Sequence, residues 1–478
     1  MLKATDKPRG IIPIAVDTSD EEMVSLYEAQ TKIYPRSVTG LFARWRWGFV
    51  FLTQVVFYGL PWLEWGQRQA VLFDLEARRF FIFGLVLYPQ DFIYLTGLLV
   101  VSALSLFLFT AVAGRQWCGY ACPQTVYTEI FLWIERKIEG DRSARMRLDA
   151  APMSVSKLAR KTAKQAAWVA LSLWTGFTFV GYFTPIDELG RSFIQMTMGP
   201  WETFWVFFYG LATYGNAGFL REQVCKYMCP YARFQSAMFD KDTLIVTYDE
   251  ARGEPRGARS RKADPAALGL GACVDCTLCV QVCPTGIDIR KGLQYECISC
   301  AACVDVCDTV MDKMGYPRGL IRYSTQNAVA KGWTRSQLVR RVLRPRVLVY
   351  TAILLVLCAV LLGSLVLRTP LKVDVVRDRA ALARIVEGGK LENVYRLQIM
   401  NATEQVQRYR ISARGLDGLA LTSEPQTEVG AAQSRWVPVR LQVPYGSAAA
   451  GSHPIVFEIQ AVDSAAHVAE DSVFLVPR

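Results

Sequence analysis

Long apolar stretches dominate the pattern of hydrophobic and polar positions along this chain of 478 residues. Five of them carry no charged side chain: 47–63, 92–113, 166–186, 203–220 and 347–367. Each is close to the roughly 17 to 25 residues that cross a bilayer as a helix. A shorter apolar run, 80–88, cannot span and is expected to lie in the membrane interface or to re-enter. The pattern predicts an α-helical core with about five spans.

Basic residues alternate with these stretches and indicate their orientation. Lys and Arg crowd residues 1–46 and 115–164, whereas 64–91 and 187–202 contain few. Because cytoplasmic loops carry the excess of Lys and Arg, the N-terminus is expected on the cytoplasmic side of the membrane and the C-terminus on the outer side. The net charge of +11 then reflects topology, and nucleic-acid binding is disfavoured.

The pattern changes to a period of two after the last apolar stretch. Short alternating runs, separated by turn residues, follow one another through residues 371–478. Alternation of this kind is typical of half-buried strands, and about a hundred residues of it predict an immunoglobulin-like sandwich.

Eight of the thirteen cysteines form two C-x2-C-x2-C-x3-C runs. This is the spacing of bacterial two-cluster ferredoxins, in which the fourth cysteine of each run binds the other cluster. One [4Fe–4S] cluster is therefore assigned to Cys273, Cys276, Cys279 and Cys307, and the second to Cys297, Cys300, Cys303 and Cys283. A zinc knuckle is disfavoured, because it uses paired CxxC or Cys/His ligands. The spacing predicts electron transfer.

Two further cysteine pairs read C-x-Y-x-C-P, at 118–123 and 225–230, and are called the CxxxCP motifs. Each follows an apolar stretch, so the repeat is expected to bring together Cys118, Cys122, Cys225 and Cys229 near the inner membrane surface. Proline suits the first position of a helix, where the helix dipole favours thiolate. Thiolates select Cu(I) and iron–sulfur species. The occupant of this four-cysteine site stays open: it is copper, another cluster, or nothing until turnover.

Together these features predict a multidomain membrane protein: a helical transmembrane core, a two-cluster ferredoxin-like domain and an all-β immunoglobulin-like domain. The expected parts in chain order are a cytoplasmic tail 1–46, a four-helix core 47–248 with both CxxxCP motifs, a flexible linker 249–265, a ferredoxin domain 266–325, a basic connector 326–346, a fifth helix 347–367 and a periplasmic domain 371–478.

The whole set of motifs, with the stretch Lys32-Ile-Tyr-Pro35-Arg36, resembles the FixG/RdxA/CcoG family, which is associated with assembly of cbb(3)-type cytochrome oxidase. The resemblance implies an oxidoreductase that reduces Cu(II) to Cu(I), with copper held by the four CxxxCP cysteines. It also implies a location in the bacterial inner membrane and, as partners, a copper chaperone or transporter and the oxidase assembly machinery. The apolar stretches themselves predict the lipid bilayer as a partner. The electron donor (quinol or soluble) and a second copy in a homodimer stay open.

Two other functions remain open from the sequence. In the first, the chain is a quinol-linked electron conduit to another reductase, and the CxxxCP motifs relay electrons without binding copper. In the second, it is a non-enzymatic scaffold for oxidase assembly, and the β domain docks the oxidase subunits.

Overall fold

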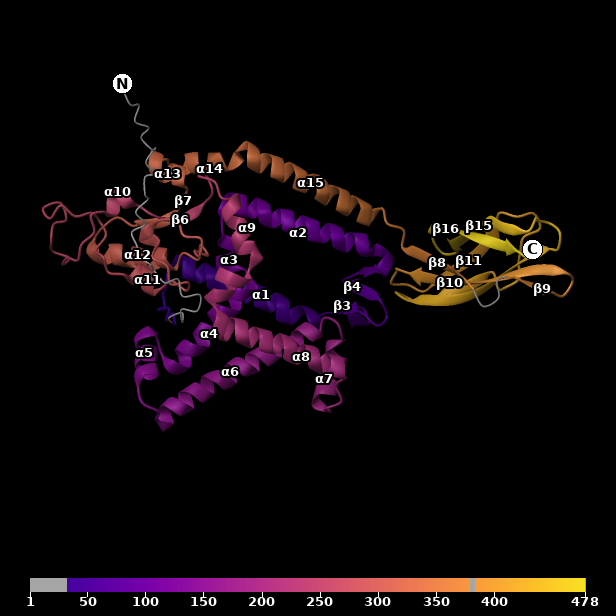
Figure 1. Cartoon of the computed structure of the whole chain (residues 1–478), viewed down its shortest axis with the longest axis horizontal. Coiled ribbons are helices and arrows are strands. Elements are labelled where there is room, and N and C mark those ends of the chain that lie inside the picture. The colour runs from indigo at the N-terminus through magenta and orange to yellow at the C-terminus, as the bar shows by residue number, and fades with distance from the viewer. Residues whose placement is uncertain (1–31, 379–382, 478) are drawn as a thin grey trace, which may run out of the picture.

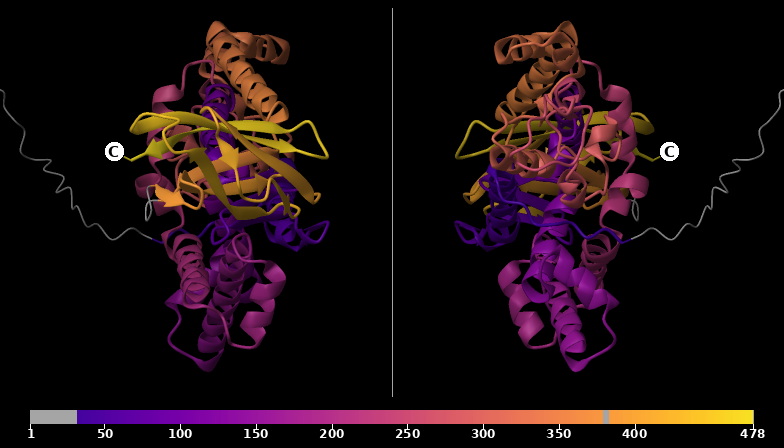
Figure 2. Two further views of the ribbon diagram at one scale, coloured as in Figure 1. Left: turned by 90° about the vertical axis from the view of Figure 1, so that its right-hand side faces the viewer. Right: turned by 90° about the vertical axis from the view of Figure 1, so that its left-hand side faces the viewer.

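The computed structural model describes residues 32–378 and 383–477, which form an elongated molecule of three regions. A helical middle region separates a cysteine-rich region at one end from a β domain at the other (Figure 1). Helix α15 (Pro345–Val366) and the pair α6 (Val155–Val180) and α8 (Pro200–Thr213) lie on opposite sides of the middle region (Figure 2).

Small residues let the long helices of the middle region approach one another closely. Helix α2 (Phe92–Ala113) lies beside α15, where a Cβ on Gly97 would stand 2.7 Å from Leu361 Cδ1. Helices α6 and α8 meet at Gly176, where a Cβ would stand 2.2 Å from the Val206 carbonyl oxygen. A larger residue at either position would separate its pair.

Further helices and helical turns complete the region around these two pairs. The α-helices are α1 (Leu41–Gly59), α3 (Gln116–Tyr120), α4 (Pro123–Glu139), α5 (Arg142–Ala150), α7 (Ile186–Ile194) and α9 (Pro230–Met238). The shorter turns are two of π type, Tyr214–Leu220 and Val224–Met228, and two of 3-10 type, Leu60–Trp62 and Pro89–Asp91.

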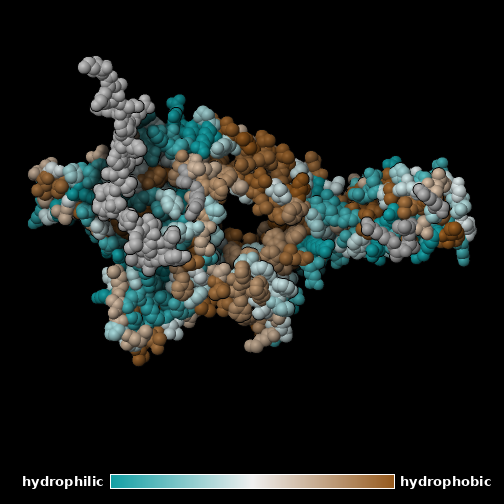
Figure 3. Space-filling view, in the orientation of Figure 1, coloured by the Kyte–Doolittle hydropathy of each residue, from teal (hydrophilic) through white to brown (hydrophobic). Residues whose placement is uncertain are grey.

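Two helices in the described part of the chain are long and apolar enough to cross a membrane, Pro89–Ala113 and Pro345–Val366. They match two of the five predicted spans. The other three predicted spans coincide with α1, which contains Arg44 and Arg46, with α6, whose first half is basic, and with the 14-residue α8. Those three stay predictions. Apolar surface is visible over the middle region, and the two ends of the molecule are more polar (Figure 3).

The apolar run 80–88 was predicted wrongly as an interfacial or re-entrant segment. It forms β4 (Arg79–Ile82) and β5 (Leu85–Leu87), which join β3 (Val71–Asp74) in an antiparallel sheet. Phe81 and Val86 of this sheet are buried against Met400 of the β domain. The run is therefore half-buried strand, and its apolar residues cover a protein surface. A small hairpin, β1 (Glu64–Trp65) and β2 (Arg68–Gln69), precedes it.

The β domain is a sandwich of two antiparallel sheets, as predicted for 371–478. One sheet contains β8 (Leu371–Arg377), β9 (Arg384–Val386), β10 (Lys390–Asn401), β12 (Ala420–Leu421) and β14 (Ser434–Pro444). The other contains β11 (Gln407–Arg414), β13 (Gln426–Val429), β15 (Gly451–Ala461) and β16 (His467–Val476). Tyr395, Tyr409 and Phe457 fill the space between the sheets and are fully buried.

The cysteine-rich region is closed by an antiparallel pair, β6 (Ile245–Tyr248) and β7 (Ile321–Ser324). It therefore begins about twenty residues earlier than the predicted boundary at 266. Between the two strands lie α10 (Glu250–Gly253), α11 (Leu278–Gln281), the 3-10 turn Ile289–Lys291 and α12 (Ala302–Met314). After β7 come α13 (Gln326–Lys331), α14 (Arg335–Arg340) and the 3-10 turn Arg341–Leu343.

Residues 249–265, predicted as a flexible linker, are held against the first cysteine loop. The Gly257 amide donates to the Cys273 carbonyl at 3.3 Å, and the Gly271 amide donates to the Pro255 carbonyl at 2.8 Å. The Arg259 guanidinium also donates to the Gly271 carbonyl, at 2.6 Å. The Arg, Gly and Pro content that suggested a linker instead supplies tight turns and carbonyl contacts around the loop.

Candidate functional site: two cluster cavities and the CxxxCP motifs

The first cavity of the cysteine-rich region is lined by four cysteines from two separate runs: Cys273, Cys276, Cys279 and Cys307. Apolar side chains of Met311, Leu320 and Ile321 close the rest of its wall. This is the grouping that the spacing predicts, with the fourth cysteine supplied by the second run.

The second cavity lies next to the first and shows the reciprocal grouping. Its cysteines are Cys283, Cys297, Cys300 and Cys303. Cys279 lines both cavities, so the two sites share a wall. Ile287, Ile289 and Ile298 surround the second cavity and exclude water from it.

The backbone of the two cysteine loops has the same unusual conformation at equivalent positions. In the first run, Asp275 and Thr277 flank the second cysteine, with φ of 51° and 55°. In the second run, Ser299 and Ala301 flank the second cysteine, with φ of 53° and 57°. Left-handed backbone costs an L-residue roughly 1–2 kcal/mol, yet it occurs four times here. Alternation of left-handed and right-handed residues turns successive backbone amides toward one side and makes a concave nest that suits an anion, including an iron–sulfur cluster.

The cysteines are arranged for a cluster rather than for a single ion. Among the described residues no three His, Cys, Asp or Glu side chains converge closely enough to hold one metal ion. Thiolates at separate corners of a cluster lie farther apart than ligands that share one ion, and four cysteines spread around each cavity fit that requirement. Burial raises the pKa of Cys297 and of Cys307 to about 12, so cluster binding would displace their protons.

Both CxxxCP motifs end where a helix begins. Cys122 is the N-cap of α4 and Cys229 the N-cap of α9, and each is followed by proline at the first helical position. Cys118 lies in α3, and Cys225 lies in the π-helical turn Val224–Met228. The predicted helix starts are confirmed.

The four CxxxCP cysteines lie within electrostatic reach of one another. Burial raises the pKa of Cys225 to about 12, and the nearby Cys122, Cys118 and Cys229 add to the rise. Burial also raises the pKa of Cys122, although amides of α4 act against it. The amides at the start of α4 favour the thiolate of Cys122, as expected for a helix N-terminus, but burial has the larger effect and the pKa is raised overall.

The first CxxxCP motif touches the loop of the second cavity directly. Cys118 belongs to one buried cluster of side chains with Ile298 and Cys300. A Cβ on Gly119 would stand 2.6 Å from the Ile298 carbonyl oxygen and 2.9 Å from Cys300 Cα. Only glycine allows this approach, which brings the motif against the backbone of a cluster ligand.

Hydrogen bonds of Tyr295, in the loop that precedes Cys297, connect this loop to both CxxxCP motifs. The Arg115 guanidinium, just before the first motif, donates to the Tyr295 carbonyl. The Tyr295 hydroxyl donates at 2.8 Å to the carbonyl of Lys226, inside the second motif. Gln235 of α9 donates to Cys118 Sγ at 3.5 Å. Sequence reasoning missed these residues, because each contact joins segments far apart in the chain.

A carboxylate in the cysteine-rich region also caps the first helix of the middle region. Asp305 of α12 accepts hydrogen bonds from the amides of Phe42 and Ala43, at 3.1 and 2.7 Å. Both amides belong to the first turn of α1, which has no side-chain cap of its own. Asp305 stands between the ligands Cys303 and Cys307, so the cap fixes the second cysteine run relative to α1.

Three family models match parts of the chain. A 4Fe-4S dicluster domain matches residues 220–326, a 4Fe-4S binding domain matches 95–140, and the IG-like fold at the C-terminal of FixG matches 361–477. The predictions of a two-cluster ferredoxin region and of an immunoglobulin-like C-terminal domain are thereby confirmed. The 95–140 match contains Cys118 and Cys122.

Curated relatives are similar over most of their length. The chain is 39% identical over 422 residues to the nitrogen fixation protein FixG of Rhizobium meliloti, covering 82% of this chain and 80% of that protein. It is 39% identical over 402 residues to protein RdxA of Cereibacter sphaeroides, covering 82% and 84%. A crystal structure of a FixG-related protein from Vibrio parahaemolyticus is 24% identical and covers 23% of this chain and 97% of that one, with a TM-score of 0.21.

Proposed function

The chain belongs to the FixG/RdxA/CcoG family of iron–sulfur redox proteins, and we propose that it is a membrane-bound cupric reductase. In this proposal the eight ferredoxin cysteines would hold two clusters, and these would supply the electrons that reduce Cu(II) at Cys118, Cys122, Cys225 and Cys229. The Cu(I) produced is then available to a copper chaperone or transporter that serves assembly of a cbb(3)-type oxidase.

The observation that carries the proposal is the contact between Gly119 and the backbone of Cys300. It brings the first CxxxCP motif, whose Cys118 is buried, directly against the backbone of Cys300, a predicted ligand of the second cluster site. When bound, the two clusters supply one-electron carriers. In the proposal, the electron passes from the second site to the CxxxCP cysteines across this contact.

The chemistry of the four cysteines supports copper as the electron acceptor. Thiolates are soft ligands and prefer Cu(I) to harder ions, so they favour the reduced product. Because no three ligating side chains among the described residues converge closely enough to hold one ion in the metal-free chain, the proposal requires the four cysteines to close on the copper when it binds. The step balances as one electron lost by a reduced cluster and one gained by Cu(II). The thiol protons that burial retains at Cys122 and Cys225 are released when copper binds.

The arrangement of the three regions supports a membrane location. The cysteine-rich region and the immunoglobulin-like domain lie at opposite ends of the apolar middle region (Figures 1 and 3). With basic residues around the cysteines, the proposal places the ferredoxin region in the cytoplasm and the C-terminal domain in the periplasm. The domain would there face the oxidase assembly machinery.

A direct test follows Cu(II) reduction by purified protein that contains its clusters and has been reduced with dithionite under anaerobic conditions. A Cu(I)-specific chelator reports product, and cluster absorbance reports electrons lost. We expect one Cu(I) for each electron lost, and loss of the reaction in Cys118→Ala/Cys225→Ala with cluster content unchanged. Equal copper reduction by the double variant would contradict the proposal.

A second candidate is supported by the 4Fe-4S binding domain model that covers Cys118 and Cys122. In that case the CxxxCP cysteines hold a further cluster, and the chain is an electron conduit to another reductase. Iron analysis separates the two: the cupric reductase contains roughly eight irons per chain, and the conduit roughly twelve.

A further inference from the structure

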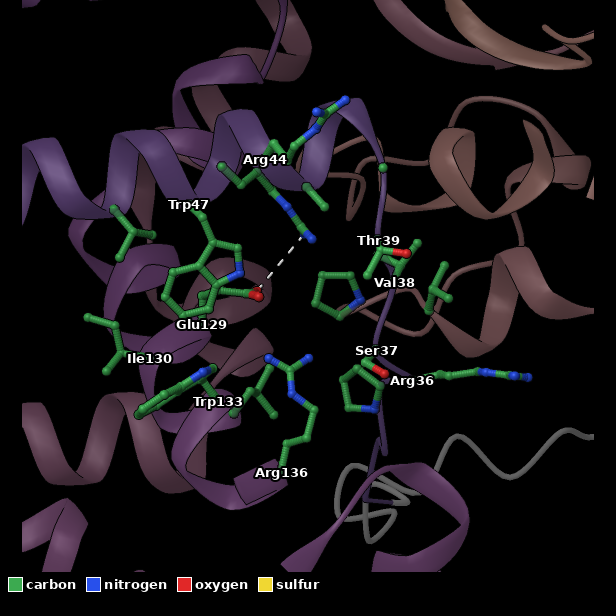
Figure 4. Close-up of a pocket in the computed structure, with 18 of the residues that line it drawn as sticks. Arg36, Ser37, Val38, Thr39, Arg44, Trp47, Glu129, Ile130, Trp133 and Arg136 are labelled. Carbon is green, nitrogen blue, oxygen red and sulfur yellow. Dashed lines mark ion pairs between the residues drawn. The ribbon is translucent and has the colours of Figure 1, made fainter. Parts of the chain in front are cut away.

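A cavity of about 1340 Å³ lies between α1, α4 and the segment that precedes α1 (Figure 4). None of the CxxxCP cysteines lines it. Its wall includes Val282 and Pro284, which flank the cluster ligand Cys283. An occupant of this cavity would therefore lie beside the second cluster site.

The wall of the cavity is suited to a flat aromatic ring with an apolar substituent. Trp47 of α1 and Trp133 of α4 line it, with ring centroids 6.4 Å apart and planes at 67°. Phe51 lines it too and is 65% exposed, as are its neighbours Leu52 and Val55 at 59% and 68%. An apolar tail would leave the cavity along this exposed face of α1.

Polar groups without partners lie in the same wall. Arg46 is 92% buried and forms an ion pair with Glu129, with 4.0 Å between Nη1 and Oε2 (Figure 4). Among the described residues, Arg46 Nε and Gln54 Oε1 have no hydrogen-bond partner. Both atoms have almost no exposed surface. A buried donor and a buried acceptor without partners are costly, and a small rotation of either side chain would let it pair with a ligand that carries oxygen and hydroxyl groups.

The ion pair also connects the cavity to the reducing site. Arg46, Glu129, Leu132 and Pro284 line both this cavity and a smaller one that reaches Cys225. Thr285 lines the smaller cavity, and its hydroxyl lies 3.3 Å from Cys283 Sγ. A redox-active occupant would thus be separated from the second cluster site by the width of a few side chains.

From these observations we propose that the cavity binds a membrane quinol, which is the electron donor of the proposed reductase. The proposal rests on the function proposed above. The quinol ring lies at Trp47 and Trp133, Gln54 Oε1 accepts a hydrogen bond from one hydroxyl, and Arg46 Nε donates to a ring oxygen.

The reaction balances as quinol to quinone with release of two electrons and two protons. The two electrons pass singly to the two cluster sites. The Glu129 carboxylate takes one proton, and the other leaves through the open side of the cavity. The donor is identified by its chemistry: an aromatic ring, two oxygens and an apolar tail match the two tryptophans, the two unpaired polar atoms and the exposed apolar face.

The test uses the full-length protein with its clusters and a short-chain ubiquinol or menaquinol under anaerobic conditions, with bleaching of the cluster absorbance as readout. We expect quinol to reduce the clusters of the wild type. In Trp47→Ala and Glu129→Gln we expect the rate of cluster reduction to fall at least about tenfold. Trp45→Ala is the matched control: Trp45 is on the same helix, is 58% exposed and does not line the cavity. Dithionite must reduce all variants to the same extent, which shows that their clusters are intact.

A photoreactive azidoquinone gives a readout that does not depend on turnover. We expect it to label peptides from residues 35–58 and 129–136. Unlabelled quinone should compete with the labelling, and Trp47→Ala should be labelled less than the wild type. Labelling confined to other segments would overturn the proposal, as would a Trp47→Ala rate equal to that of Trp45→Ala. A tightly bound phospholipid that occupies the cavity and resists displacement by quinone would overturn it too.

The failure of this proposal is distinguishable from failure of the reductase. If quinol does not reduce the clusters, or only NADH does, while dithionite-reduced protein still reduces Cu(II), the quinol site is wrong and the reductase stands. If quinol reduces the clusters but reduced protein leaves Cu(II) unchanged, the quinol site stands and the reductase is wrong.

Discussion

Gly119 is the position at which the two halves of the redox site touch. Its hydrogen faces the Ile298 carbonyl and the Cys300 backbone, with no room for a methyl group. Backbone atoms at this distance cannot move aside as the end of a flexible side chain can. In the proposed reductase, this close approach sets the rate of electron transfer between the second cluster site and the CxxxCP cysteines.

We expect Gly119→Ala to push the first CxxxCP motif away from the Cys300 loop and to slow copper reduction by about tenfold or more, with little loss of cluster content. Stopped-flow oxidation of the reduced clusters by Cu(II) measures the rate. Gly190→Ala is the control, because within the described structure a Cβ at Gly190 meets nothing within 4 Å. Unchanged rates in both variants would show that the contact does not carry the electrons.

The half-buried thiol of Cys225 makes the stability of the metal-free protein depend on pH. Its pKa is raised to about 12, first by burial, whereas an unfolded cysteine titrates near about 8.5. Because the folded-state value is the higher one, the stabilisation is complete below about pH 8.5 and is lost as the pH rises toward 12. We expect the free energy of unfolding of the metal-free protein to fall above about pH 8.5.

Alkylation gives the same test at one residue. At pH 8, iodoacetamide should modify Cys225 about a thousandfold more slowly in the folded metal-free protein than in guanidinium, because thiolate is the nucleophile. Quantitative mass spectrometry of the Cys225 peptide measures both rates. Equal rates would contradict the burial of this thiol.

Helix α1 is held by a cap that another region supplies. The amides of Phe42 and Ala43 find their acceptor in Asp305 of α12, so the helix that lines the proposed quinol cavity is fixed to the second cysteine run. A movement of either element would change the distance between the cavity and Cys283.

We expect Asp305→Asn to weaken this junction by about 1–2 kcal/mol, since a charged acceptor of two amides is replaced by a neutral one. Thermal unfolding in detergent, at constant cluster content, measures the loss. Asp312→Asn is the matched control on the same helix: Asp312 is 46% exposed and pairs with Arg318 at the surface, where such pairs contribute about 0–1 kcal/mol. A larger effect of Asp312→Asn than of Asp305→Asn would contradict the cap.

Local sequence spacing predicted the elements whose geometry is local. The two cysteine runs predicted which cysteines line each cavity, and proline after Cys122 and Cys229 predicted the starts of α4 and α9. The contacts of Gly119, Tyr295 and Asp305 could not be predicted, because they join segments that lie far apart in the chain. The raised pKa of Cys122 was missed for another reason, since spacing does not report desolvation.

The molecule as a whole separates its redox chemistry from its β domain. The domain is docked through the sheet β3–β5, where Phe81, Val86 and Tyr88 are buried against it. The Tyr88 hydroxyl donates to the carbonyls of Asn401 and Gln433, at 3.0 and 3.1 Å. Apolarity alone suggested a membrane segment at 80–88, because the partner that buries it lies three hundred residues away.

We expect Phe81→Ala to loosen the domain, since removal of a buried phenylalanine costs about 3–5 kcal/mol. Faster protease cleavage between α15 and β8 would report the loosening. Copper reduction by dithionite-reduced protein should be unchanged, because the cysteine-rich region, which contains both cluster cavities, is at the other end of the molecule (Figure 1). Phe83→Ala, at a residue that is 42% exposed, is the control. Loss of copper reduction in Phe81→Ala with intact clusters would show that the domain takes part in the chemistry.

The central claim is that electrons pass from the ferredoxin region to copper at the CxxxCP cysteines. Freeze-quench EPR tests it most directly, on dithionite-reduced protein mixed anaerobically with one equivalent of Cu(II). The Cu(II) signal and a reduced-cluster signal should disappear at the same rate in the wild type. In Cys118→Ala/Cys225→Ala both signals should persist. A Cu(II) signal that stays while the clusters stay reduced, or equal decay in the double variant, would contradict a cupric reductase with its site at the CxxxCP motifs.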